Sequence, residues 1–395
     1  MLRQDMIGEA TRLTRAGRLV EATALLQRML HGESAPDPTS RRAQPALEGP
    51  TIIDVQANAV EDDNGPDLAR AESHMLRELL DRATHRPGFV LRGVTARKPL
   101  SMSDIVPDGT RFTEGSYSNP AGSRAYKLFI PSRNQHQSLP LIVMLHGCTQ
   151  SPDDFAAGTR MNFVAEEKSC FVVYPAQRAK ANHAKCWNWF RAADQQRGSG
   201  EPSIIAGITR QVMRDFPIDP NRVYVGGLSA GAAAAAVMGN TYKDLYAAIG
   251  VHSGLACGAA IDLPSALVAM RQGGESSHRV VFGDGPPVPT IVLHGDRDTT
   301  VHPNNGDQVL EQSVRAMRLQ KKIDRGQVPG GHAYTRTIFS DASGRGILEH
   351  WNIHGAGHAW SGGSPAGSYT DPKGPDATRE MLRFFLEHSL AQRSG

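Results

Sequence analysis

The sequence predicts an α/β fold: a mostly parallel sheet with helices on both faces, plus a small N-terminal helical appendage. One observation is a glycine-flanked serine between a strand-like run and a helix-forming run, at residues 222–239. Another is the order strand, helix, strand, helix after residue 108, which is typical of a parallel sheet. The third is size, because 395 residues with 39% hydrophobic content can form one large domain and a smaller part.

The glycine-flanked serine lies in RVYVGGLSAGAAAAAVMG. A β-branched and aromatic run stops at two glycines, and a run of alanines begins at Ala230, which predicts a strand, a sharp turn and a helix. The pattern G-x-S-x-G places a serine hydroxyl at the tip of such a turn. Glycines let the two arms of the turn approach closely. The pentapeptide alone is a weak signal in a chain with 40 glycines, but its context makes Ser229 the candidate nucleophile.

Composition and charge narrow the classes of function. The formal net charge is +3 and the pI is near 8.7, with no basic stripe carrying interleaved aromatic residues, so no nucleic-acid partner is expected. No stretch has the apolar length of a membrane span. No Cys or His spacing resembles a metal site, and no cofactor is expected.

The N-terminal part predicts separate pieces before the main domain. Residues 1–32 read as a helical appendage made of a helix pair, and residues 33–66 as a flexible linker. Residues 67–107 contain a further amphipathic helix and a connecting segment, and residues 108–392 form the main domain. Self-association through the N-terminal helices is a hypothesis for the appendage. No secretory signal is visible, which favours a cytoplasmic location.

The main domain contains a regular series of predicted elements. An edge hairpin begins at residue 111, and further strands are expected at 141–145, 170–175, 222–227, 246–251, 289–293 and 348–353. Helices are expected at 160–168, at 203–216 with Ser203 as a candidate cap, and at 376–388. The segment 255–287, rich in glycine and proline, is expected to lie over the sheet edge or the cleft.

Polar side chains at two later strand ends complete a candidate catalytic triad. Asp298 follows one buried strand in HGDRD, and His358 follows another in HGAGHAW. Asp296 is the competing carboxylate, expected instead to bond its own loop or an arginine, and His354 is expected to cap its strand. The chain order Ser229, Asp298, His358 is that of the α/β-hydrolase type.

Two backbone N–H groups are candidates for an oxyanion hole. In this architecture one donor follows the nucleophile and the other lies in the loop after an earlier strand, which indicates Ala230 and Cys148. His146 precedes that loop and is expected to shape it rather than to act as a base. Ester hydrolysis through an acyl-enzyme is the chemistry that these groups support.

Seven ordered motifs carry a family resemblance. LHGCTQSPDDFAAGTRMN, YPAQ, CWNWF, NRVYVGGLSAG, VHSGL, HGDRDTTVHPNNG and HGAGHAWSGGSPAGSYTDPKGPDATREMLRFF together resemble the poly(3-hydroxybutyrate) depolymerase family of serine esterases. The same broad group includes feruloyl and acetylxylan esterases. The resemblance implies an α/β-hydrolase fold and hydrolysis of polyester or short-chain esters, supports the triad and Cys148, and implies an extracellular location.

Several alternatives stay open at this stage. A feruloyl, acetylxylan or general short-chain carboxylesterase is the main one, and a peptidase or a non-catalytic polymer-granule-binding protein are others. Trp187 and Trp189 are predicted either to line a substrate cleft or to pack in the core. Trp360 and Ser253, which lie in the family motifs, are further candidates for substrate contact. Among the four cysteines, a disulfide between Cys148 and Cys186 is one hypothesis, and free buried thiols are the other.

Overall fold

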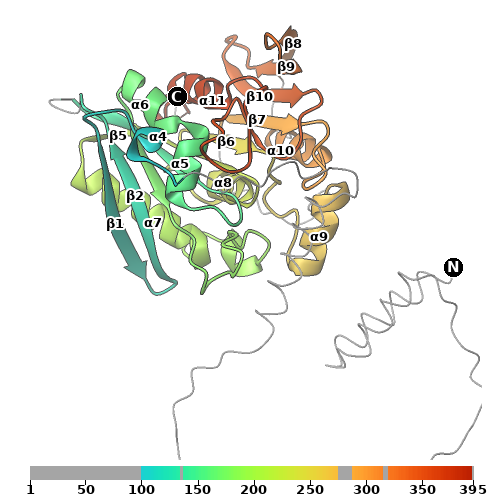
Figure 1. Cartoon of the computed structure of the whole chain (residues 1–395). Helices are drawn as coiled ribbons and strands as arrows, with labels where there is room; N and C mark the ends of the chain where they lie inside the picture. The colour runs from blue at the N-terminus through green and yellow to red at the C-terminus, as the bar shows by residue number, and fades with distance from the viewer. Residues whose placement is uncertain (1–98, 134–136, 275–286, 315–318, 394–395) are drawn as a thin grey trace, which may run out of the picture. The chain divides into compact units, whose positions relative to one another are not determined.

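The computed structural model of the chain describes residues 99–133, 137–274, 287–314 and 319–393 (Figure 1). The helix pair, the linker and most of the segment 67–107 that the sequence predicts lie outside these residues. The proposed self-association through residues 1–32 therefore stays a prediction. No helix in the described ranges is long and apolar enough to cross a membrane.

A single ten-stranded sheet runs through the described part of the chain, in the order β1-β2-β4-β3-β5-β6-β7-β10-β9-β8 (Figure 1). Strands β4, β3, β5, β6, β7 and β10 are parallel to one another, and antiparallel strands extend the sheet on both sides. The strands are β1 (Arg111–Asn119), β2 (Gly122–Ile130), β3 (Leu139–Leu145), β4 (Phe171–Pro175), β5 (Ile218–Leu228), β6 (Ala248–His252), β7 (Thr290–Gly295), β8 (Gln320–Gln327), β9 (Ala333–Ser340) and β10 (Gly346–Ile353). Two short strands, β11 (Trp360–Ser361) and β12 (Thr370–Asp371), pair separately.

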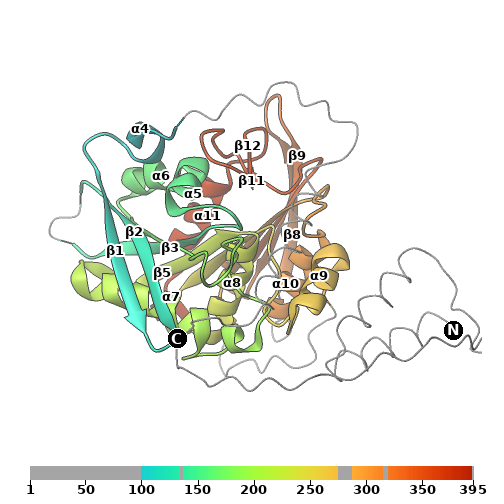
Figure 2. The same cartoon turned by 60° about the horizontal axis from the view of Figure 1, so that its bottom comes forward.

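Helices cover both faces of the sheet, as the sequence predicts (Figure 2). On one face lie α7 (Gly200–Asp215), α8 (Ala230–Thr241), α9 (Leu263–Gln272) and α10 (Asn304–Val314). On the other lie α4 (Met102–Ile105), α5 (Pro152–Thr159), α6 (Met161–Lys168) and α11 (Ala377–Leu386). Short 3₁₀ turns occur at Ala192–Gln195 and Ala391–Arg393.

The continuous apolar run of β3 is explained by burial on both faces. Every residue of this strand is buried, with Leu141 and Val143 in one hydrophobic cluster and Ile142 and Met144 in the other. Successive side chains of a strand point to opposite faces, so a strand with helices on both sides has no polar positions. This confirms the sequence interpretation of the run.

Helix α7 begins earlier than the sequence predicts. Its N-cap is Ser199 and its first residue is Gly200, so Ser203 lies in the first turn, where its hydroxyl donates to the Gly200 carbonyl at 2.8 Å. Pro202 also fits the first turn, because its missing N–H would have no intrahelical acceptor there. The prediction that Ser203 caps this helix is therefore wrong.

Phe385 provides a test of the packing between α11 and the sheet. Its ring stacks on Tyr224 of β5 with centroids 5.0 Å apart, and it is fully buried. We expect Phe385→Ala to lower the free energy of unfolding by about 3–5 kcal/mol, because it removes a large core side chain. Chemical denaturation measures this. Ile323→Ala, at a position 47% exposed on β8, should change the free energy by less than about 0.5 kcal/mol. A similar loss in both variants would contradict the packing described here.

Candidate active site

Ser229 lies at the turn between β5 and α8. Its φ is 57° and its ψ is −121°, a conformation that a side-chain-bearing residue rarely adopts. A Cβ added to Gly231 would lie 2.0 Å from the carbonyl oxygen of Leu145, and one added to Gly227 would lie 2.5 Å from the same atom. The glycines are required because α8 passes directly against the end of β3.

Asp298 and His358 meet at the same edge of the sheet. Asp298 follows β7, His358 follows β10, and His358 Nδ1 lies 2.7 Å from Asp298 Oδ2. The other carboxylate oxygen of Asp298 accepts from the backbone N–H groups of Thr300 and Val301 at 2.9 and 2.8 Å. The parallel pairing of β7 with β10 therefore brings together two residues that are far apart in the sequence.

Asp298 is held as a carboxylate. Burial by itself would raise its pKa, but the charge of His358 and the hydrogen bonds from His294 and His358 hold the pKa of Asp298 well below its ordinary value. Because a carboxylate only accepts, the proton between the two groups belongs on His358 Nδ1. In the neutral form of the ring, Nε2 then carries no proton.

The competing carboxylate, Asp296, has a different environment. Its Oδ1 accepts from the Gly355 N–H at 2.7 Å, and its Oδ2 lies 3.0 Å from His354 Nδ1. The opposite nitrogen of His354 lies 2.9 Å from the Thr335 hydroxyl. Asp296 thus bonds the loop after β10, not its own loop or an arginine as expected, while His354 braces the end of β10, as the sequence predicts.

The loop after β3 lies beside Ser229. A Cβ added to Gly147 would lie 3.6 Å from Ser229 Cβ, and the next residue, Cys148, lines the same cavity as the serine. Ala230 is the first residue of α8, where a backbone N–H has no acceptor within the helix. Both residues that the sequence indicated as oxyanion donors therefore lie next to Ser229.

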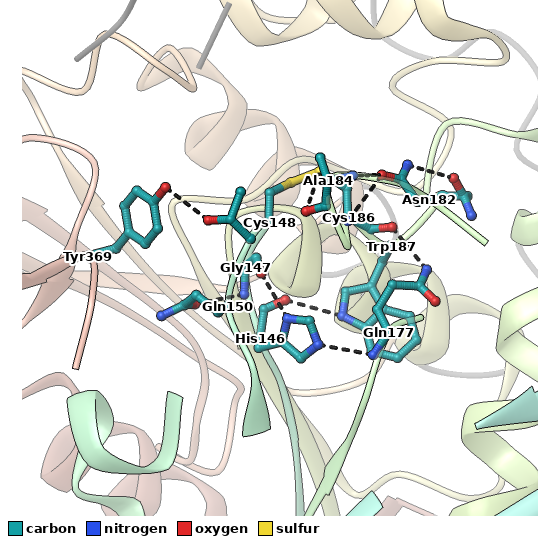
Figure 3. Close-up of a disulfide and its surroundings, with 12 residues drawn as sticks. His146, Gly147, Cys148, Gln150, Gln177, Asn182, Ala184, Cys186, Trp187 and Tyr369 are labelled. Carbon is teal, nitrogen blue, oxygen red and sulfur yellow. Dashed lines mark hydrogen bonds between the residues drawn. A yellow bond between two sulfur atoms is a disulfide. The ribbon is translucent and has the colours of Figure 1, made fainter. Parts of the chain in front are cut away.

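A disulfide joins this loop to the tryptophan segment (Figure 3). Cys148 is bonded to Cys186, which confirms that sequence hypothesis. The loop is also held by hydrogen bonds from Thr149 N to the Ala184 carbonyl and from Gly147 N to Gln150 Oε1. Cys170 and Cys257 are free and buried, and burial raises the pKa of each thiol to about 12, so neither is a reactive thiolate at neutral pH.

Two buried histidines at strand ends act as loop braces. Burial lowers the pKa of His146 to about 4, and its Nε2 accepts from the Gln177 N–H at 3.1 Å. Burial, with help from the charges of His294 and His358, lowers the pKa of His252 to about 3, and its Nε2 accepts from the Ser361 N–H at 3.0 Å. Both rings are therefore neutral, which agrees with the sequence interpretation of His146.

An apolar cavity opens at Ser229. Its empty space is about 410 Å³, part of it open to solvent. None of the lining residues is charged; they are Cys148, Cys186, Trp189, Phe190, Ser229, Ala230, Leu255, Ala266, Met270 and Val301. Val301 lines this cavity and also donates its N–H to Asp298, so one residue connects the cavity lining to the Asp298–His358 pair.

The structure contradicts three expected substrate contacts. Trp187, Trp360 and Ser253 are each buried, with exposures of 0%, 1% and 0%. Trp187 donates from its indole N–H to the His146 carbonyl at 3.1 Å, and Trp360 donates to the Thr378 hydroxyl at 3.0 Å. The segment around Trp187 is not a strand, so the alternation that would place Trp187 and Trp189 on one face does not apply. Of the four residues expected to contact substrate, only Trp189 lines the cavity.

Sequence reasoning missed the wall that α9 contributes. Ala266 and Met270 are four residues apart, so they lie on one face of this helix, and that face lines the cavity. The amphipathic pattern LPSALVAMRQ could have predicted the helix. Its place over the serine could not be read from the pattern. Leu255 and Phe190 were missed for the same reason.

Comparison with known proteins identifies the family. A family model described as esterase PHB depolymerase matches residues 124–329. The chain belongs to this family. It is also 30% identical over 295 residues to poly(3-hydroxyalkanoate) depolymerase C of Paucimonas lemoignei, covering 72% of this chain and 70% of that protein. The resemblance predicted from the motifs is confirmed, and the protein is a carboxylic ester hydrolase.

Two further comparisons concern the wider group and the fold. The chain is 28% identical over 238 residues to probable acetylxylan esterase A of Neosartorya fischeri, covering 54% of this chain and 63% of that protein. The solved acetyl xylan esterase from Aspergillus awamori superposes with a TM-score of 0.54 at 19% identity, covering 70% of this chain and 99% of that chain. The predicted α/β-hydrolase fold is confirmed.

Removal of the disulfide tests how this PHB depolymerase-family site is held. We expect Cys186→Ser to lower the free energy of unfolding by about 2–5 kcal/mol, because the bond closes a loop across 38 residues. We also expect lower kcat/KM at a temperature where the variant is folded, because the loop carrying Cys148 loses its covalent tie. Cys170→Ser is the control, since that thiol is buried and free. Wild-type kcat/KM in Cys186→Ser would contradict this role.

Proposed function

We propose that the protein is a serine esterase that hydrolyses ester bonds of poly(3-hydroxybutyrate)-type polyester or its oligomers through an acyl-enzyme. The observation that carries the proposal is an apolar cavity that Ser229 lines and that Val301 connects to the Asp298–His358 pair through its N–H bond to Asp298. A hydroxyl on a strained turn at the cavity wall, together with an imidazole held by a carboxylate, is what acyl transfer requires.

The proposed mechanism assigns a role to each group. His358 Nε2 takes the Ser229 proton as the hydroxyl attacks the ester carbonyl, and later returns it to the leaving alcohol. Asp298 holds the imidazole in the required tautomer and stabilises its charged form. The N–H groups of Cys148 and Ala230 bind the oxyanion, each contributing about a hundredfold or more to the rate. Water then attacks the acyl-enzyme by the same route.

The cavity lining supports a short, uncharged acyl group. No charged residue lines it, and the walls are aromatic, aliphatic and sulfur-containing side chains. A 3-hydroxybutyryl unit is small, apolar and without charge, so it fits such a lining. The relative from Paucimonas lemoignei is named as a poly(3-hydroxyalkanoate) depolymerase, which favours polyester as the substrate.

The main alternative is a feruloyl or acetylxylan esterase or a general short-chain carboxylesterase. The relative from Neosartorya fischeri is named as a probable acetylxylan esterase, and an acetyl group would also fit an uncharged cavity. A non-catalytic granule-binding protein would have no use for the paired Asp298 and His358. That pairing therefore favours an enzyme.

A substrate panel with wild type and Ser229→Ala tests the proposal. The panel contains p-nitrophenyl acetate and butyrate, 3-hydroxybutyrate oligomers, amorphous polymer, methyl ferulate, acetylated xylan and a peptide anilide. We expect wild type to cleave the oligomers and polymer, and Ser229→Ala to lose about 10⁴-fold or more in rate. A strong preference for ferulate or acetyl esters would move the substrate to the alternative. Turnover that survives in Ser229→Ala would refute the proposed nucleophile.

The two neighbouring carboxylates offer a matched pair of variants. We expect Asp298→Asn to lower kcat by about 10⁴-fold, because an amide no longer holds the required His358 tautomer. Asp296→Asn should keep kcat within about tenfold of wild type, since Asp296 only braces His354 and Gly355. Hydrolysis of p-nitrophenyl butyrate measures both variants. Equal losses would contradict the assignment of Asp298.

A further inference from the structure

Glu201 is a buried carboxylate on α7, outside the groups used in the mechanism. Its side chain is 8% exposed. One oxygen accepts from Asn188 N at 2.7 Å, and the other from Asn188 Nδ2 at 2.9 Å and Arg124 Nη2 at 3.1 Å. The latter oxygen also accepts from the amide of Gln177. All four partners are donors, and burying a charged group is costly unless it is paired in this way.

Two of the residues bound by Glu201, Asn188 and Gln177, are connected to the active-site cavity and its loops. Asn188 stands between Trp187, whose indole bonds the His146 carbonyl, and Trp189, which lines the cavity. Gln177 donates its side-chain amide to the Cys186 carbonyl at 2.9 Å (Figure 3). Cys186 is in turn bonded to Cys148. One carboxylate therefore holds both the cavity wall and the segment tied to the oxyanion loop.

We propose that Glu201 is a positioning residue for ester hydrolysis, acting through Asn188 and Gln177 to set the oxyanion loop and the Trp189 wall. The inference rests on the proposed oxyanion role of Cys148. It does not depend on which ester is the natural substrate.

A neutral amide cannot replace this carboxylate. Glutamine has one oxygen acceptor and an NH₂ donor, whereas the site presents four donors. Whichever way the amide introduced by Glu201→Gln is turned, its NH₂ group faces another donor. The segment must then shift or leave a buried donor without an acceptor. A shift of about 1 Å in a group near the reacting centre can lower a rate by about a hundredfold.

Glu349 provides a matched control for Glu201. It is 2% exposed and accepts from Arg336, Arg383 and the Trp351 indole. It lies on β10 opposite Ile291, the second residue of β7, rather than at the strand end that carries the active-site loops. Its replacement by glutamine also disturbs a buried carboxylate network, but one that contacts neither the oxyanion loop nor the cavity lining.

The experiment compares Glu201→Gln with Glu349→Gln in the full chain. The measurements are kcat and KM for p-nitrophenyl butyrate, together with the melting temperature. We expect both variants to lose thermal stability, but only Glu201→Gln to lose kcat, by about tenfold or more and with little change in KM. A kcat within about twofold of wild type in Glu201→Gln, or an equal kcat loss in Glu349→Gln, would overturn the proposal.

A double-mutant cycle keeps the test decisive. We expect Asn188→Ala to lower kcat as well, and the loss in the double variant Glu201→Gln/Asn188→Ala to be smaller than the product of the two single losses, because both substitutions break the bond between Glu201 and the Asn188 side chain. Additive losses would overturn the route through Asn188. Ser229→Ala is measured in the same series. Turnover surviving in that variant would refute the proposed nucleophile without bearing on Glu201.

Discussion

The close approach of α8 to the end of β3 is the constraint on which the site depends. Gly231 passes so near the Leu145 carbonyl that no Cβ fits between them. This contact puts the first N–H of α8, the serine at its N-terminal end and the loop after β3 within one small volume. It is a contact between backbones, so it needs glycine rather than any chemical group. Ser229, which lies at the same crossing, has a strained positive φ.

Buried polar groups then hold the loops that surround the serine. His146, His252 and Asp296 each bond a backbone N–H of a neighbouring loop, and Glu201 holds the segment on the far side of the disulfide. These groups are neutral histidines or well-paired carboxylates, which offsets the cost of their burial. The loops therefore have a fixed shape although they contain little regular structure.

Local sequence patterns predicted the hairpin at one edge of the sheet and its buried parallel strands, but they missed the strands at the other edge. The run at β3 is apolar throughout because helices cover both of its faces, and no helical alternative fits so short a segment. Strands β8 and β9 were not predicted. Their sequences QKKIDRGQ and AYTRTIFS are largely polar, and the structure leaves much of β8 exposed. An exposed antiparallel hairpin has little apolar periodicity to reveal it.

The sequence by itself determined which polar residues follow the strands, a serine on a glycine turn and then an acid and a histidine in a fixed order, and it determined the family of the chain. These signals are local, because each needs only its own strand and turn. Tertiary structure alone decided which apolar side chains reach the cavity. Trp187 and Trp189 look equivalent in the sequence and both are buried, yet only Trp189 lines the cavity beside α9. Exposure depends on what packs against a residue, and those partners come from distant parts of the chain.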